Sequence, residues 1–223
     1  MNTQSVLEGF NPAPAAVTIE AVGQFCHVPS NSRCLSPNAT SDARSRKAAV
    51  FLDRDGVLLE DVNFLTSPSE IRLLPGVTRA LRALQDHFCV VVVTNQSGVA
   101  RGLLTEADLL AIHLDLVRRL DAAGAVVDAL YYCPHLPEAK VPEYRVECEC
   151  RKPKPGMLRR AERDWNIDLA RSFIVGDSPR DVEAGRRVGV KGTLLGAGHY
   201  TLPNACERAP DLATAAELIL GSA

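Results

Sequence analysis

Short apolar runs alternate with amphipathic segments from about residue 47 onward, and this pattern predicts the secondary structure. Strands are expected where apolar residues are contiguous and often β-branched, at AAVFLD, CVVVVTNQ, DALYYC, SFIVGD and KGTLLG. Helices are expected where apolar residues recur every three or four positions, at PGVTRALRALQDHF, TEADLLAIHLDLVRRLDAAG, PGMLRRAERDWN, PRDVEAGRRVG and near 210–220. Pro75 should lie near the first turn of the first helix, and Thr105 should cap the second.

The regular alternation of strand and helix predicts the fold class. One α/β domain with a doubly wound, Rossmann-like parallel sheet and helices on both faces accounts for the order of the elements. Residues 1–45, in contrast, are rich in Pro, Ser, Asn, Ala and Thr and show little periodicity. We therefore expect a flexible N-terminal extension over 1–45 and one domain over 46–223. A non-native start and a docking tail are the alternatives for the extension.

Polar residues end three of the predicted strands: FLDRD, VVVTNQ and FIVGD each pass from apolar residues to acid or amide groups. In an open parallel sheet, the carboxyl ends of the strands form the binding crevice. Three strands that are far apart in sequence therefore deliver polar side chains to one edge of the sheet, which predicts a functional site there.

Four aspartates belong to this edge. Asp53 and Asp55 end the first strand, where Gly56 allows the chain to turn, Asp177 ends a later strand, and Asp181 follows it. Without a cation these carboxylates would repel each other, and hard oxygen ligands suit Mg²⁺. Aspartate can also act as a covalent nucleophile in phosphoryl transfer. A single Asp more often caps a turn or a helix, but D-x-D-G and G-D-x-x-x-D together favour a magnesium-dependent catalytic site.

A second candidate feature follows the strand that ends at Thr94 and Asn95. The next residues, QSGVARG, form a glycine-containing turn before a helix. A hydroxyl and backbone N–H groups at such a turn can hold a phosphate. A plain polar turn explains T-N-Q-S-G equally well, but its position opposite the acids favours the phosphate site.

Three cysteines and a histidine form a candidate metal site: Cys133, His135, Cys148 and Cys150. Three thiolates and one imidazole match a closed, four-coordinate zinc site of structural type. An iron–sulfur site and a redox dithiol are the alternatives. The chain has seven cysteines, an odd number that argues against a disulfide framework and for a reducing compartment. We expect the others to be incidental or buried free thiols: Cys26, Cys34, Cys89 and Cys206.

Two cations, Arg151 and Lys152, directly follow the last of these cysteines. Charged residues of this kind are ordinarily solvated. Here, chelation would fix the preceding loop, and the prolines and glycine of KPKPG restrain the path into the next helix. We therefore expect the zinc loop to direct both cations toward the crevice, Arg151 as a bidentate phosphate ligand and Lys152 as a point charge. Lys154 is expected to lie on the surface.

The overall charge limits the partners. A net charge of −2 over 223 residues provides no basic field for nucleic acid or an anionic membrane, which also disfavours a zinc-ribbon nucleic-acid module. No apolar run approaches the roughly 20 residues that span a bilayer. The first residues do not combine a basic stretch with an apolar one, so we expect a cytoplasmic protein. An open crevice that takes a small substrate without a partner lid suggests a monomer.

Taken together, these motifs resemble the haloacid dehalogenase superfamily of phosphohydrolases. FLDRDGVLLED matches its first motif, VVVTNQ its second, the lysine of CRKP its third and IVGDSPRD its fourth. Within the superfamily, TNQSGVARG, YYCPHLPE and CECRKPKPGM are similar to the zinc-loop phosphatases that act on heptose bisphosphates. The chain departs from that subgroup at Val57 in place of Thr, at Ser178 in place of Lys and in the segment DVNF.

The resemblance implies a mechanism and a role for each motif residue. Asp53 attacks phosphorus to form an aspartyl-phosphate, and Asp55 protonates the leaving sugar oxygen and then activates water. Asp53, the Asp55 carbonyl and Asp177 hold Mg²⁺. Thr94 and Lys152 stabilise the phosphoryl group that is transferred.

The resemblance also implies a substrate, a phosphorylated sugar that loses its 7-phosphate during the synthesis of nucleotide-activated heptose. Thr94 and Lys152 would contact it together with further residues: Asp61, Phe64, Asn95, Gln96, Ser97 and Arg151. Histidinol phosphate is the alternative substrate, because histidinol-phosphate phosphatases are close relatives with a similar zinc loop. A phospho-acceptor module is the non-enzymatic alternative. It is disfavoured because a signalling receiver would carry its phosphorylated Asp on a different strand from the other acids.

Overall fold

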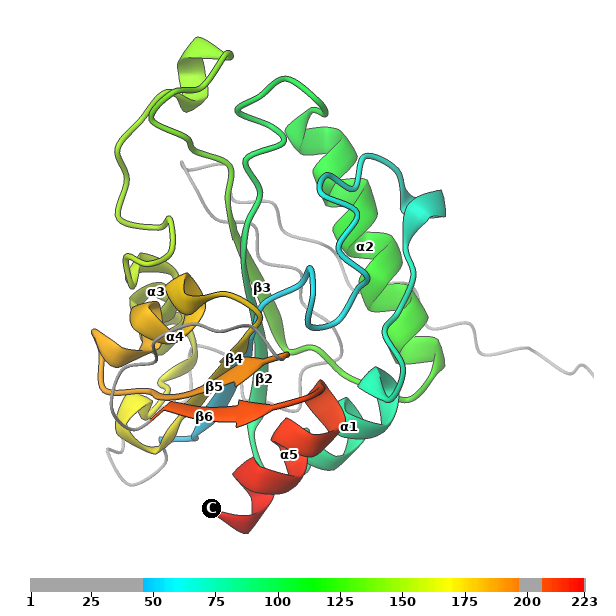
Figure 1. Cartoon of the computed structure of the whole chain (residues 1–223), viewed down its shortest axis with the longest axis vertical. Helices are drawn as coiled ribbons and strands as arrows, with labels where there is room; N and C mark the ends of the chain where they lie inside the picture. Colours follow the sequence, from blue (N-terminus) through cyan, green and yellow to red (C-terminus); the bar gives the residue numbers. More distant parts are fainter. Residues whose placement is uncertain (1–45, 197–205, 223) are drawn as a thin grey trace, which may run out of the picture.

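The computed structural model describes residues 46–196 and 206–222, so the expected extension over 1–45 lies outside the described residues (Figure 1). The described chain forms one six-stranded sheet in the order β3-β2-β1-β4-β5-β6. Every neighbouring pair of strands is parallel. The strands are β1 (Ala49–Leu52), β2 (Cys89–Asn95), β3 (Ala129–Cys133), β4 (Phe173–Gly176), β5 (Lys191–Leu195) and β6 (Cys206–Ala209). This architecture confirms the predicted doubly wound parallel sheet.

Helices cover both faces of the sheet. One core cluster joins it to α1 (Val77–Leu84), α2 (Glu106–Ala122) and α5 (Leu212–Gly221). A second cluster on the opposite face joins it to α3 (Gly156–Trp165) and α4 (Pro179–Arg186). Strand β1 serves both, because its successive side chains point to opposite faces and all of them are buried. The near-continuous apolar runs of the central strands follow from burial on both sides.

The element boundaries differ from the prediction in two places. Strand β6 was not expected, because only its last residue, Ala209, is buried and an edge strand carries little apolar signal. Helix α1 is shorter than the segment expected to be helical: it begins at Val77, after an N-cap Gly76 in the left-handed region at φ 79°, and ends at Leu84, and Pro75 lies just before its first turn. The Thr105 cap of α2 is confirmed, since its side chain accepts a hydrogen bond from the Asp108 N–H.

The strand order places the crevice. From β1 the sheet continues through β2 and β3 in one direction, and from β4 through β5 and β6 in the other. Ligands of doubly wound sheets bind at such a switch point, outside the carboxyl ends of the two strands. The segments after β1 and β4 therefore meet in one crevice. Among the described residues, the helices are all too short or too polar to cross a bilayer.

Candidate active site

Three carboxylates converge at the switch point. Asp53 follows β1, Asp177 follows β4 and Asp181 lies in the first turn of α4, with ligand oxygens all within 4.8 Å of one another. Gly56, in the left-handed region at φ 73°, packs its backbone against Asp177 so closely that a Cβ there would lie 2.1 Å from Oδ2. The predicted gathering of acids at this edge is therefore present.

Lys152 lies beneath these acids and is fully buried. Its Nζ is 2.8 Å from Oδ2 of Asp53, 2.7 Å from Oδ1 of Asp181 and 2.7 Å from the Val93 carbonyl. Burial would lower the pKa of Lys152, but the charges of Asp181 and Asp53 raise it above its ordinary value. The lysine is therefore a fixed cation in contact with Asp53.

Asn95, at the end of β2, holds the backbone of this lysine. Its Nδ2 donates to the Lys152 carbonyl at 3.1 Å, and its Oδ1 accepts from the Lys152 N–H at 3.0 Å. The residue was expected to contact substrate, and it does line the cavity described below. Its two polar side-chain atoms are nevertheless occupied in placing Lys152.

The charges of the cluster depend on one another. Burial raises the pKa of Asp53, but the adjacent Lys152 charge and hydrogen bond and the Arg54 N–H outweigh it and hold that pKa below its ordinary value. Burial and then the Asp53 charge raise the pKa of Asp177. Asp181 is raised to a pKa of about 6, mainly by burial. Asp53 is thus the carboxylate of this group that is most strongly held ionised.

Asp55 points away from the three-acid group. Its Oδ1 and Oδ2 accept from the guanidinium of Arg54 at 2.9–3.1 Å, and Oδ2 also accepts from Nε2 of Gln96 at 2.8 Å. Gln96 in turn donates to Oγ1 of Thr94 at 2.9 Å. The buried His113 on α2 contacts Nη1 of Arg54 at 3.0 Å. Sequence reasoning missed Arg54 and His113, although Arg54 stands between the two aspartates of D-x-D.

A cavity of about 300 Å³ opens above these groups. Its lining includes most of the residues that the sequence predicted for the site: Asp53, Asp55, Asp61, Phe64, Thr94, Asn95, Gln96, Ser97, Arg151 and Asp177. Lys152 does not line the cavity itself, but its Nζ contacts the carboxylate of Asp53, which does. The cavity also includes Asn63, which lies within the segment 61–64 expected to contact substrate, and two residues that sequence reasoning did not single out, Arg101 and Arg180.

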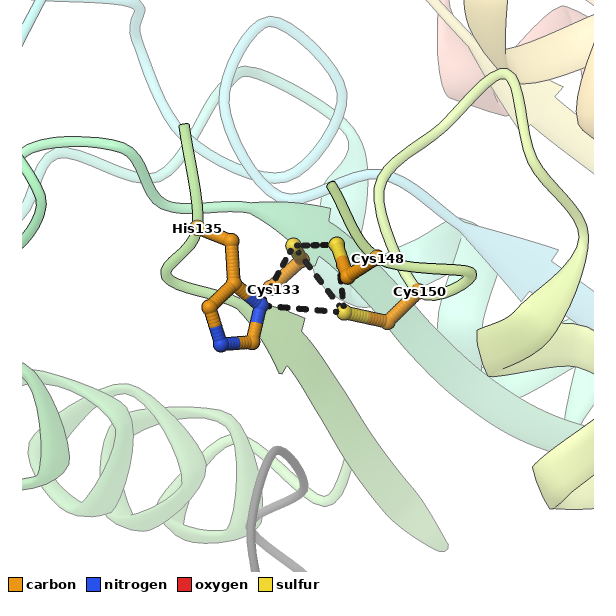
Figure 2. Close-up of side chains that lie close together, drawn as sticks. All are labelled: Cys133, His135, Cys148 and Cys150. Carbon is orange, nitrogen blue, oxygen red and sulfur yellow. Dashed lines mark hydrogen bonds between the residues drawn. The ribbon is translucent and has the colours of Figure 1, made fainter. Parts of the chain in front are cut away.

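The zinc-type ligands come together as predicted (Figure 2). The three sulfur atoms of Cys133, Cys148 and Cys150 are 3.1–3.5 Å apart, and Nδ1 of His135 is 3.4–3.6 Å from two of them. These distances are far too long for disulfides, and all three thiols are free. A tetrahedral zinc site with Zn–S of ~2.3 Å separates its ligand atoms by ~3.7 Å. The cluster therefore fits a closed zinc site.

The loop that carries this cluster is held to α2 and leads into the active site. Glu106, in the first turn of α2, accepts hydrogen bonds from the hydroxyls of Tyr132 at 2.8 Å and Tyr144 at 3.0 Å. Arg151 directly follows the last ligand, lines the cavity and donates to the His135 carbonyl at 3.2 Å. Lys154 pairs at 3.1 Å with the exposed Glu149, in agreement with its expected surface position.

Comparison with known proteins gives consistent matches. Residues 149–218 match the family model described as HAD-hydrolase-like. A D-glycero-beta-D-manno-heptose-1,7-bisphosphate 7-phosphatase of Rhodopseudomonas palustris is 42% identical over 66% of this chain and 82% of its own length. The enzyme of that name from Bordetella bronchiseptica is 43% identical over 78% of this chain and 98% of its own.

A solved structure extends the similarity to the fold. The D,D-heptose 1,7-bisphosphate phosphatase of B. bronchiseptica, crystallised with magnesium and phosphate, matches with a TM-score of 0.70 and 41% identity. The match covers 79% of this chain and 99% of that one. The order of the sheet, the acids at its switch point and these matches agree, and the chain belongs to the HAD-like hydrolases, in the family of the heptose-1,7-bisphosphate 7-phosphatases.

Proposed function

We propose that this protein is a Mg²⁺-dependent phosphatase that removes the 7-phosphate of D-glycero-β-D-manno-heptose 1,7-bisphosphate, in the synthesis of nucleotide-activated heptose. The observation that carries the proposal is Asp53, ionised, in contact with the buried Lys152 and open to a cavity lined by cationic and polar groups. The named activity of relatives that are 42–43% identical supports the same substrate.

Asp53 is the nucleophile in this mechanism. A carboxylate oxygen of Asp53 forms a bond to phosphorus, and the bond from phosphorus to the sugar oxygen breaks. Asp55 acts as the general acid toward that oxygen, so that the sugar leaves as an alcohol. Lys152 and Thr94 stabilise the charge on the phosphoryl group, because both are fixed before the reaction begins. The product of this step is an aspartyl-phosphate and a neutral sugar hydroxyl.

The second step returns the enzyme to its starting state. Asp55, now a carboxylate, takes a proton from a water molecule while the water oxygen bonds to phosphorus. The bond from phosphorus to Asp53 breaks, and inorganic phosphate leaves. Asp55 is suited to both steps because it lies at the cavity, separate from the three-acid group.

The acids fit a magnesium ion. We assign its protein ligands to Asp53, Asp177 and the Asp55 carbonyl, in agreement with the oxygen chemistry that Mg²⁺ prefers. Asp181 is engaged with Lys152, so it is the least available of the converging carboxylates. When bound, the ion supplies positive charge to the phosphoryl oxygens and lowers the repulsion between phosphate and the Asp53 carboxylate.

The rim of the cavity suits a second phosphate. Arg101 lies over the ring of Phe64 at 5.5 Å, Arg151 donates to a backbone carbonyl, and Arg180 donates to the hydroxyl of Ser178 at 3.0 Å. The contacts of Arg101 and Arg151 are with neutral partners, so their charges can interact with an anion, whereas the charge of Arg180 also acts on Asp177. A bisphosphate places one phosphate at Asp53 and the other near this rim. A substrate with a single phosphate would leave the rim charges unused.

We further propose a structural zinc at the cysteine cluster and a monomeric, cytoplasmic protein. All four ligands come from this chain, so the zinc needs no other donor and serves to hold the segment that presents Arg151 and Lys152. The proposal of a monomer rests on the open cavity, which can take a small substrate without a lid from a partner chain. Free thiols at close range are stable as metal ligands in a reducing compartment, which supports the cytoplasm.

The test is phosphate release by the purified protein with Mg²⁺ on a panel of heptose 1,7-bisphosphate in both anomeric forms, heptose 7-phosphate and histidinol phosphate. ³¹P NMR identifies which phosphate leaves. We expect release from the 7-position of the β-anomer, and loss of turnover by at least ~10³-fold in Asp53→Asn. Asp115→Asn, in a surface ion pair on α2, is the matched control and should be fully active. Equal activity of Asp53→Asn and the control would refute the nucleophile, and a preference for histidinol phosphate would refute the substrate.

A further inference from the structure

A second buried cation, Arg54, lies directly behind the active site. Its side chain is 1% exposed. Arg54 is not one of the described residues that line the cavity. The guanidinium instead spans two acceptors on opposite sides. Nε and Nη2 donate to the carboxylate of Asp55 through three contacts of 2.9–3.1 Å, and Nη1 contacts Nε2 of His113 at 3.0 Å.

The contact with His113 fixes the state of the imidazole. A guanidinium can only donate, so Nε2 of His113 must accept, and the imidazole is neutral with its proton on Nδ1. Burial and the adjacent charge of Arg54 lower the pKa of His113 well below its ordinary value, which agrees with this assignment. His113 is fully buried on α2, with its ring 5.5 Å from that of Tyr132.

This arrangement has a cost. Within the described part of the chain, Nδ1 of His113 has no hydrogen-bond partner. An unpaired buried donor is unfavourable, whereas an apolar residue at the same position on the core-facing side of α2 would carry no such penalty. The contact with Arg54 is the one feature of His113 that an apolar side chain could not reproduce. The histidine is therefore explained by what it does to Arg54.

Asp55 is held on both of its oxygens. Oδ1 accepts two hydrogen bonds from Arg54, and Oδ2 accepts one from Arg54 and one from Gln96. The fork of a guanidinium fixes the plane of a carboxylate as well as its position, which the single charge of a lysine could not do. The Asp55 side chain remains 28% exposed and reachable from the cavity.

We propose that Arg54 and His113 are positioning residues for Asp55: the imidazole orients the guanidinium, and the guanidinium orients the carboxyl that serves the leaving oxygen and the attacking water. The inference rests on the proposed function, in which Asp55 is the general acid and base. Its consequence is that loss of this support should impair the steps that need a proton transferred and spare the attack of Asp53 on phosphorus.

Two substrates separate those steps. The sugar oxygen of heptose bisphosphate must be protonated as it leaves, whereas the leaving group of p-nitrophenyl phosphate departs as a stable anion without a proton. With p-nitrophenyl phosphate, a variant with misplaced Asp55 should form the aspartyl-phosphate normally and hydrolyse it slowly. Rapid mixing should then show a burst of about one equivalent of p-nitrophenolate per enzyme. Because the burst counts intact sites, a partly unfolded preparation gives a smaller burst and is distinguished from a positioning defect.

The variants are Arg54→Met, His113→Phe and His113→Gln, with Arg186→Met, in a surface ion pair on α4, as the control. For Arg54→Met we expect kcat on heptose bisphosphate to fall by ~10²-fold, within the usual range for general acid–base catalysis, and the burst to stay near one equivalent. His113→Phe, which cannot accept from Arg54, should lose about tenfold, and His113→Gln, which can, about threefold or less.

Several results would overturn the inference. One is full activity of Arg54→Met and His113→Phe on both substrates, in an experiment where the wild type is active and Asp55→Asn is inactive. Another is an equal fall on both substrates without a full burst, and a third is equal losses in His113→Phe and His113→Gln. If Arg54→Met does not fold, the comparison of the two His113 variants still decides. Failure of the proposed function would look different, because the wild type would then not hydrolyse heptose bisphosphate at all.

Discussion

Charge balance is the main residue-scale constraint on the active site. Three carboxylates converge there, Asp53, Asp177 and Asp181, and one buried ammonium, Lys152, compensates a single charge. Two negative charges remain when all three acids are ionised, which is the charge that a divalent cation neutralises. Without the cation, burial and repulsion raise the pKa of Asp177 and Asp181. The electrostatics of the protein alone therefore favour a bound divalent ion.

At the same scale, Gly56→Ala tests how closely the backbone must approach Asp177. The new Cβ would lie 2.1 Å from Oδ2 of Asp177, so the carboxylate must move. We expect weaker Mg²⁺ binding, with several-fold more Mg²⁺ needed for half-maximal activity and a lower kcat. The measurement is phosphate release against Mg²⁺ concentration.

Gly124→Ala is the control for backbone strain. Gly124 has φ 72°, close to the 73° of Gly56, but nothing lies within 4 Å of the added Cβ. Both substitutions should cost about 1–2 kcal/mol of stability, because both force an L-residue into the left-handed region. Only Gly56→Ala should alter the Mg²⁺ requirement. If the two variants behaved alike in the Mg²⁺ titration, the close approach to Asp177 would not matter for the metal.

At the scale of elements, the loop between β3 and α3 has a defined task. Its ends carry the four zinc-type ligands, and the residues after Cys150 supply one cation to the cavity lining and one to Asp53. Tyr144 ties the middle of the loop to α2 through Glu106. This long loop contains one short 3-10 helix, Pro142–Tyr144, and depends on such cross-links for its position. The candidate zinc site and Lys152 are thus parts of one segment.

Zinc removal should therefore act on catalysis through this loop. In Cys148→Ser, we expect metal analysis to fall from about one equivalent to well below half, since a structural zinc site requires its four ligands. Activity should fall with it, because Lys152 and Arg151 lose their fixed position, while the sheet stays folded by circular dichroism. Cys206→Ser, a partly exposed thiol outside the cluster, is the control and should retain its metal. Unchanged zinc in Cys148→Ser would show that the ligand assignment is wrong.

At the scale of the whole molecule, the two core clusters draw on residues from 48 to 219. The strands, the residues that line the cavity and the helices, except for the last two residues of α5, lie within this range. We therefore propose that residues 46–223 form one folding unit and that 1–45 is a separate extension. The proposed division falls just before β1, the central strand that Asp53 follows.

Deletion of residues 1–45 tests that division. The shortened chain should unfold in urea within ~0.5 kcal/mol of the full-length protein, because distant surface changes rarely exceed this value. Its kcat on heptose bisphosphate should be unchanged. The full-length protein, measured in parallel, is the control. A loss of several kcal/mol, or of most activity, would place part of the extension in the domain.

Much of this molecule follows from its sequence alone. The fold class follows from the alternation of apolar runs and amphipathic segments, because periodicity records which side of each element is buried. The acids at the strand ends follow from the same pattern, since the carboxyl ends of parallel strands share one edge. The zinc ligands follow from spacing, because all four lie in one loop. In each case the signal is carried by residues close together in the chain or by the class of the fold.

Other features depend on the tertiary structure. Arg54 meets His113 across 59 residues, Asn95 holds Lys152 across 57, and β6 adds an edge strand that has one buried residue. No local pattern marks these pairs, because they depend on the order of the strands and on which helix packs over which strand. For Lys152, the sequence determined a cation beside the site, and the tertiary structure buried it between two carboxylates. The physical reason is that a side chain's charge is local, whereas its burial and its partners belong to the packed molecule.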